Sequence, residues 1–161
     1  MPLILKGDAK KVIAITSGFA DLDFTNKWDM TPGSLYAISK AALNMVIAKF
    51  SAQYKKQGVL FLAVCPGMVE VGHYDKGMDS PFSVSFSEKY LLTLFCVLAT
   101  EQDKAKLGET VAKFKQYSPS FKGPITTEES VTCVRKVIDE ASIEKGNGGD
   151  FLSHFGTKQW L

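Results

Sequence analysis

Two short, continuously apolar segments constrain the fold of this chain most strongly. Residues 11–17 read KVIAITS and residues 59–64 read VLFLAV, and neither alternates between apolar and polar positions. Such runs are typical of strands that are buried on both faces. Pro66 and Gly67 follow the second run and end it sharply. We therefore predict two buried strands.

The segment between these strands has a strong helical pattern from residue 34 to about residue 56. It carries two apolar stripes, which are Leu35, Ile38, Ala42 and Val46, and Leu43, Ile47, Phe50 and Tyr54. A strand, helix and strand in this order indicate a parallel βαβ unit with a right-handed crossover, and hence an α/β layer fold. One stripe can pack on the sheet, whereas the other needs a neighbouring helix or a second subunit.

The remaining elements are predicted from local signals. Residues 18–33 and 72–81 are rich in Gly and Asp and are expected to be loops, and residues 87–115 return to a helical pattern. Thr126 and Glu129 have capping-box spacing, and the helix behind them carries Val131, Val134 and Ile138 on one face. Residues 150–155 are expected to form a last short strand. At 161 residues, the chain fits a single domain.

Composition argues against several classes of function. A formal net charge of +2, with scattered lysines, does not indicate a nucleic-acid-binding protein. No segment approaches the roughly 18 consecutive apolar residues that a membrane-spanning helix needs. Cys65, Cys96 and Cys133 are far apart, without metal-ligand spacing, which favours buried free thiols. We expect a cytoplasmic protein with no membrane, nucleic-acid or metal partner.

Tyr36 and Lys40 are the residues that indicate a particular chemistry. They are four positions apart, so on a helix they share a face, one turn from each other. A free phenol has a pKa of about 10, which makes it a poor acid-base catalyst near neutral pH. A nearby ammonium stabilises the phenolate and lowers that pKa. Taken alone, however, a Tyr-x-x-x-Lys pattern is weak, because a core tyrosine and a solvated lysine would produce it too.

The order of features resembles the C-terminal half of a short-chain dehydrogenase/reductase, and most closely a fungal subgroup of that family. The resemblance covers most of the chain: a strand that ends at Ser17, a helix that opens with Tyr36 and Lys40, and a strand that ends at Pro66-Gly67. It implies a Rossmann-like three-layer α/β fold, of which this chain holds the C-terminal part, with about three parallel strands and flanking helices.

The resemblance also implies roles for individual residues. Tyr36 would be the acid-base group, Lys40 would bind the nicotinamide ribose and lower the tyrosine pKa, and Ser17 would hydrogen-bond the substrate oxygen. Pro66, Gly67 and Val69 would border the nicotinamide of NAD or NADP. The implied activity is NAD(P)-dependent oxidation or reduction of a small, apolar alcohol or carbonyl compound. Helical residues 87–115 would shape its pocket, although a core helix explains the same apolar residues.

The sequence departs from the family pattern in ways that leave alternatives open. The glycine-rich pyrophosphate turn and the family's catalytic asparagine belong to an N-terminal half that residues 1–161 do not contain. The spacing from Ser17 to Tyr36 is long, and Val71 stands where a threonine often contacts the carboxamide. We expect the strand that bears Ser17 to be an open edge and the Leu43 stripe to lack its usual neighbour. The helix at 34–56 could then mediate homo- or hetero-oligomers, and a catalytically silent, regulatory chain is the alternative to an enzyme.

Overall fold

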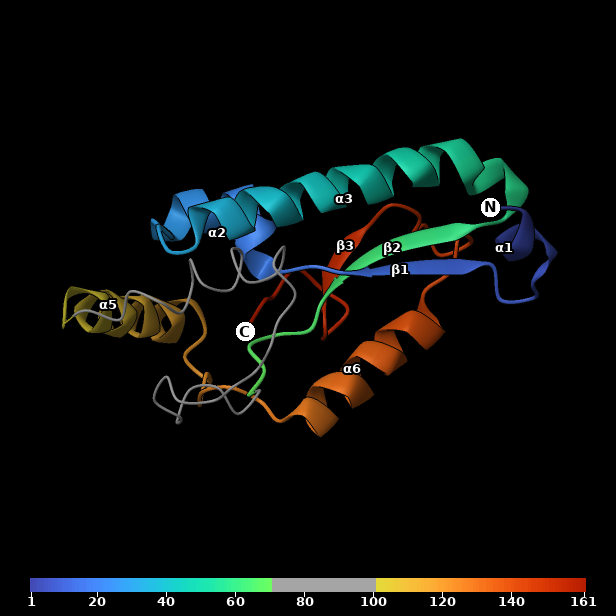
Figure 1. Ribbon diagram of the computed structural model, residues 1–161. Coiled ribbons are helices and arrows are strands. Elements are labelled where there is room, and N and C mark those ends of the chain that lie inside the picture. The colour runs from blue at the N-terminus through green and yellow to red at the C-terminus, as the bar shows by residue number, and fades with distance from the viewer. Residues whose placement is uncertain (71–100) are drawn as a thin grey trace, which may run out of the picture.

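A computed structural model describes residues 1–70 and 101–161, and the side chains of 1–70 and 109–161. In this part of the chain, helix α3 (Ser34–Tyr54) covers one face of a small sheet and helix α6 (Thr127–Glu140) covers the other (Figure 1). The predicted three-layer arrangement, with three parallel strands and flanking helices, is confirmed. The predicted loop at 72–81 and residues 87–100 of the predicted helix at 87–115 lie outside the described residues, as do Val71 and Cys96.

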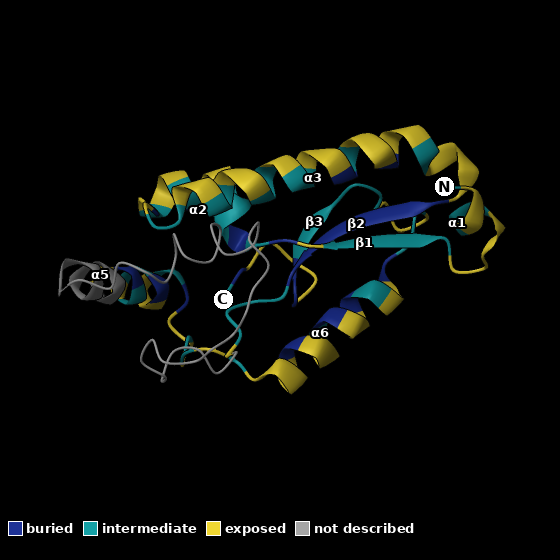
Figure 2. Ribbon diagram, viewed as in Figure 1, coloured by how far each residue is buried: buried dark blue, intermediate teal, exposed yellow. Residues whose placement is uncertain are grey.

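The sheet has the order β1-β2-β3, and both pairs of neighbouring strands are parallel. Strand β1 is Lys11–Ile15, β2 is Leu60–Cys65 and β3 is Phe151–Ser153. Strand β2 is central and buried along its whole length, as its continuous apolar run predicts (Figure 2). Strand β1 is only half-buried, and Ile15 is 50% exposed. The prediction that β1 is buried on both faces is therefore wrong. Within the described residues, β1 is an edge strand of the sheet, which agrees with the prediction that the strand bearing Ser17 has an open edge.

Helix α3 lies on the sheet through the second of its two apolar stripes. Ile47 is buried against Val59, Phe61 and Ala63, and the rings of Phe50 and Phe61 stack with centroids 5.7 Å apart. We expected this stripe to lack a neighbour, and that expectation is wrong. The stripe that faces away from the sheet is the first one, whose exposed apolar residues are Leu35, Ile38 and Val46, joined by Met45.

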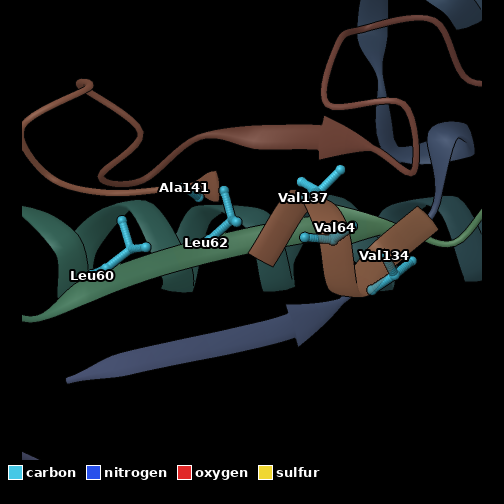
Figure 3. Close-up of a cluster of buried hydrophobic side chains, with 6 residues drawn as sticks. All are labelled: Leu60, Leu62, Val64, Val134, Val137 and Ala141. Atoms are coloured by element: carbon cyan, nitrogen blue, oxygen red, sulfur yellow. The ribbon is translucent and has the colours of Figure 1, made fainter. Parts of the chain in front are cut away.

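Helix α6 closes the opposite face of the sheet. Val134, Val137 and Ala141 face Leu60, Leu62 and Val64 of β2 and form a continuous apolar cluster (Figure 3). The predicted capping box is confirmed at the start of the helix, because Glu129 N donates to Thr126 Oγ1 and Thr126 N donates to Glu129 Oε2. Val131 is 57% exposed and does not join the buried face as predicted. Val137, three residues after Val134, occupies the buried position instead.

Residues 18–33 form two short helices, so the prediction of a loop is wrong. A 3₁₀ turn, η1 (Gly18–Ala20), is followed by α2 (Leu22–Trp28). Asp21 caps α2, since its carboxylate accepts a hydrogen bond of 2.7 Å from Phe24 N. Asp29 ends the helix in a left-handed conformation with φ of 48°. Asp21 and Asp29, which contributed to the prediction of a loop, therefore lie at the two caps of this helix.

Short elements complete the described structure. Helix α1 (Pro2–Lys6) precedes β1, η2 (Lys55–Gln57) follows α3, and α5 (Glu101–Tyr117) precedes α6. Side chains of α2, α5 and the C-terminal tail build a second core around Phe24, Met30, Cys65, Phe114 and Trp160. No helix within the described residues is long and apolar enough to cross a membrane.

Candidate functional site

Three predicted motifs come together where β1 and β2 end. They are Ser17 after β1, Pro66-Gly67 after β2, and the pair Tyr36 and Lys40 at the start of α3. Thr16 N donates to Val64 O at 2.8 Å, and this bond continues the pairing of β1 and β2 beyond the strands themselves. Gly18 N then donates to the thiol sulfur of Cys65 at 3.1 Å. Because parallel strands end on the same side of a sheet, Ser17 and Pro66 leave it next to each other. The third motif, at the start of α3, reaches the same edge through Lys40.

The pair Tyr36 and Lys40 lies on one face of α3, as its spacing predicts. Lys40 Nζ lies 5.6 Å from the centroid of the Tyr36 ring, within the range of a cation–π contact. The same ammonium donates to the backbone carbonyl of Ile15 at 3.3 Å. Lys40 thus connects the helix to the end of β1, two residues before Ser17. Both residues are half-buried.

Ser17 caps the 3₁₀ turn that follows β1. Its hydroxyl oxygen accepts a hydrogen bond of 3.3 Å from Phe19 N, and this bond fixes where the side chain lies. A serine hydroxyl has one O–H donor in addition to its acceptor sites, so the cap leaves the O–H able to donate to another oxygen. Trp160 packs on the adjacent Gly18 so tightly that an added methyl group would lie 2.7 Å from the Trp160 Cβ. The hydrogen bond from Phe19 N and the packing of Trp160 on the next residue, Gly18, restrict where Ser17 can lie.

Cys65 lies buried between these motifs. Its free thiol is at the end of β2 and accepts the hydrogen bond from Gly18 N. Burial raises the pKa of the Cys65 thiol, and backbone hydrogen bonds from Gly67 and Gly18 only partly oppose this. The shift favours the neutral thiol, which indicates packing rather than nucleophilic chemistry. Cys133, the other cysteine in the described range, is half-buried. Of these two cysteines, only Cys65 is a buried free thiol as predicted.

The segment from Pro66 to Glu70 follows β2 directly and lies beside Ser17. Val69 pairs with Ile125 in an isolated parallel bridge. Ile125 N donates to Met68 O, and Glu70 N donates to Ile125 O, each at 2.8 Å. Gly67 has φ of 84°, a left-handed conformation that favours glycine. The predicted residues Pro66, Gly67 and Val69 are thus held in one short, ordered segment.

Two residues that the sequence did not indicate contact this segment. Ser130 Oγ on α6 donates to Pro66 O at 2.8 Å. The His154 ring, directly after β3, lies against Gly67, where an added methyl group would be 2.8 Å from Cε1 and 2.9 Å from Nδ1. Burial lowers the pKa of His154 below its ordinary value of 6.5. No local sequence signal connects either residue to Pro66 or Gly67, because both contacts are made across the fold.

Comparison with known sequences identifies relatives along the whole chain. It is 47% identical over 161 residues to the short chain dehydrogenase virK of Hypocrea virens and 44% identical to the short-chain dehydrogenase/reductase iacC of Pestalotiopsis fici. The short-chain dehydrogenase/reductase AacuF of Aspergillus aculeatus is 38% identical over 162 residues. All of this chain is matched in each case, but it spans only about half the length of these relatives. No family model matches the sequence.

Two solved structures with a similar fold are carbonyl reductases. An NADPH-bound carbonyl reductase from chicken fatty liver aligns with 97% of this chain and 47% of its own, with a TM-score of 0.58 and 20% identity. The carbonyl reductase Sniffer of D. melanogaster aligns with 91% of this chain and 39% of its own, with a TM-score of 0.52 and 17% identity. These structural similarities support the Rossmann-like α/β fold. The sequence relatives are the evidence for the family. Over its whole length, the chain is similar to members of the short-chain dehydrogenase/reductase family.

Proposed function

We propose that this chain carries the proton-transfer half of an NAD(P)-dependent oxidoreductase, in which Tyr36, Lys40 and Ser17 act on the oxygen of a small, apolar carbonyl compound or alcohol. The observation that carries the proposal is the position of the Lys40 ammonium. It lies 5.6 Å from the Tyr36 ring centroid while bonded to Ile15 O at the end of β1. A cation fixed beside a phenol favours the phenolate, which a tyrosine needs in order to exchange a proton near neutral pH.

Each of the three side chains has a separate task in this proposal. Tyr36 gives a proton to the substrate oxygen in reduction and removes one in oxidation. Ser17 donates a hydrogen bond to the same oxygen, which orients it and stabilises the negative charge that develops there. Lys40 keeps the Tyr36 proton exchangeable through its positive charge. The rigid attachment of Ser17 and Lys40 to the end of β1 supports such preorganisation.

The chemistry of the donor groups fits a nicotinamide cofactor. An ammonium carries three N–H donors, and the hydrogen bond to Ile15 O uses one of them. The others suit the hydroxyl groups of a ribose, and the Pro66 to Val69 segment would border the ring beside it. The bound nicotinamide would supply or accept the hydride. We propose that the pyrophosphate-binding half of the fold is not part of residues 1–161, consistent with the half-length match to the relatives.

The proposal extends to partners and location. Helix α3 presents an exposed apolar stripe, of which Leu35 and Ile38 are 61% and 64% exposed. We propose that this stripe mediates a homo- or hetero-oligomer. A cytoplasmic location is consistent with the free thiols of Cys65 and Cys133.

Cofactor titration tests the proposal directly. Trp160 packs on Gly18 next to Ser17, so its fluorescence should respond when a molecule binds beside the site. Titration of the folded protein with NADPH, and separately with NADH, should give a saturable change for at least one of them. NADPH is the first choice because the chicken carbonyl reductase is described as NADPH-bound. If neither gives a saturable change, the enzyme proposal for this chain is wrong, and the catalytically silent alternative takes its place.

A further inference from the structure

The turn at Pro66-Gly67 is held by residues that lie far away in the sequence. Ser130 is in the first turn of α6, is 4% exposed, and donates its hydroxyl proton to Pro66 O at 2.8 Å. Its own backbone N–H already donates to Thr126 O at 3.0 Å, as part of the helix. The side chain is therefore fixed by a well-ordered helix start, and its hydroxyl has a definite partner on the turn.

His154 supports the same turn from another direction. It is 5% exposed, and its ring lies so close to Gly67 that no side chain fits between them. The ring also contacts the Phe155 ring, with centroids 3.8 Å apart and the two planes tilted by 38°. Gly67 has φ of 84°, and a glycine adopts this and several other backbone conformations with little preference, so contacts from outside can select one of them. Ser130 fixes the carbonyl that precedes Gly67, and the His154 ring blocks one side of Gly67 itself.

We propose that Ser130 and His154 are positioning residues, which hold the Pro66-Gly67 turn in the conformation that binds the nicotinamide cofactor. This inference rests on the proposed function, since it assigns a cofactor to the turn. Neither residue touches the cofactor in this account, and both act through the backbone of residues 66 and 67. Loss of the Ser130 hydroxyl should therefore weaken cofactor binding and leave the proton-transfer group intact.

The experiment compares three variants of α6 in the 161-residue chain. Ser130→Ala removes the hydroxyl, Ser130→Thr keeps it, and Thr132→Ala makes a matched change at an exposed position two residues away. We expect Ser130→Ala to raise the Kd and KM for NADPH by up to about tenfold, the range for one lost hydrogen bond. The kcat at saturating NADPH should change little. Ser130→Thr should restore most of the affinity, and Thr132→Ala should match the unchanged protein.

Hydrogen exchange of the peptide that covers residues 62–70 gives a second readout, independent of activity. It should be faster in Ser130→Ala than in Thr132→Ala, while the thermal unfolding temperature shows that the fold is kept. The inference would be overturned if Tyr36→Phe abolishes activity, as the proposed function requires, but Ser130→Ala binds NADPH as tightly as the unchanged protein. If the unchanged protein binds neither NADPH nor NADH, the proposed function fails. The exchange comparison then decides whether Ser130 holds the turn, and equal exchange in the two variants rejects that role as well.

Discussion

Replacing Gly67 with alanine should destabilise the protein much more than the same replacement at Gly58. Both glycines have left-handed backbones, with φ of 84° and 73°. They differ in their surroundings, because a methyl group at Gly67 would lie 2.8 Å from the His154 ring, whereas one at Gly58 would meet no atom within 4 Å. Gly58→Ala therefore measures the cost of the backbone conformation alone, and Gly67→Ala adds the steric overlap.

The expected magnitudes follow from these two contributions. A left-handed conformation costs a residue with a Cβ roughly 1–2 kcal/mol. Overpacking in a well-packed region adds about 1–3 kcal/mol. The free energy of unfolding should thus fall by about 1–2 kcal/mol in Gly58→Ala and by about 2–5 kcal/mol in Gly67→Ala.

Urea denaturation of the two variants measures these values, provided that the m-value stays constant. A double-mutant cycle with His154→Ala then isolates the steric contribution, since removal of the ring should return about 1–3 kcal/mol to the Gly67→Ala variant. Equal destabilisation at the two glycines, or a coupling energy near zero, would refute the packing of His154 against Gly67.

Three further predictions concern other parts of the structure. Because burial lowers the pKa of His154, the unfolded chain binds more protons than the folded one between that lowered pKa and 6.5, so the free energy of unfolding should fall as the pH drops through this range. His154→Gln should reduce that dependence in pH-resolved thermal unfolding, and an unchanged pH profile would contradict it. Thr126→Ala removes the capping box of α6 and should cost about 1 kcal/mol in urea denaturation, whereas exposed Thr127→Ala should cost less. Ile38→Glu places a charge in the exposed apolar stripe of α3 and should lower the molar mass in light scattering; a monomeric unchanged protein would exclude this role for the stripe.

The sequence predicted the elements whose signals are local and redundant. The continuous apolar run of β2 identified a fully buried central strand, and Thr126 with Glu129 identified the start of α6. The Tyr36 and Lys40 spacing predicted their shared helix face, and the structure agrees. In each case the pattern and the physical cause lie within a few neighbouring residues.

The failures arise where tertiary context decides between local alternatives. Asp21 favours both turns and helix caps, so the pattern at 18–33 could not distinguish a loop from the short helices that form. Both stripes of α3 are apolar, and only the packing of one of them on Val59, Phe61 and Ala63 shows which stripe faces the sheet. Ser130 and His154 remained unrecognised for the same reason, because their contacts with residues 66 and 67 join segments that are more than 60 residues apart.

The central claim, that Tyr36 is the acid-base group of a nicotinamide-dependent reaction, is tested most directly by a matched pair of Tyr→Phe variants. Tyr36 and Tyr54 are on the same helix, and the same hydroxyl is removed from each. The measurement is kcat for NADPH-dependent reduction of a panel of small, apolar aldehydes and ketones. We predict that Tyr36→Phe lowers kcat by roughly 10²-fold or more while NADPH still binds, and that Tyr54→Phe has no effect. A Tyr36→Phe variant that keeps the kcat of the unchanged protein, or an unchanged protein without measurable turnover, would contradict the claim.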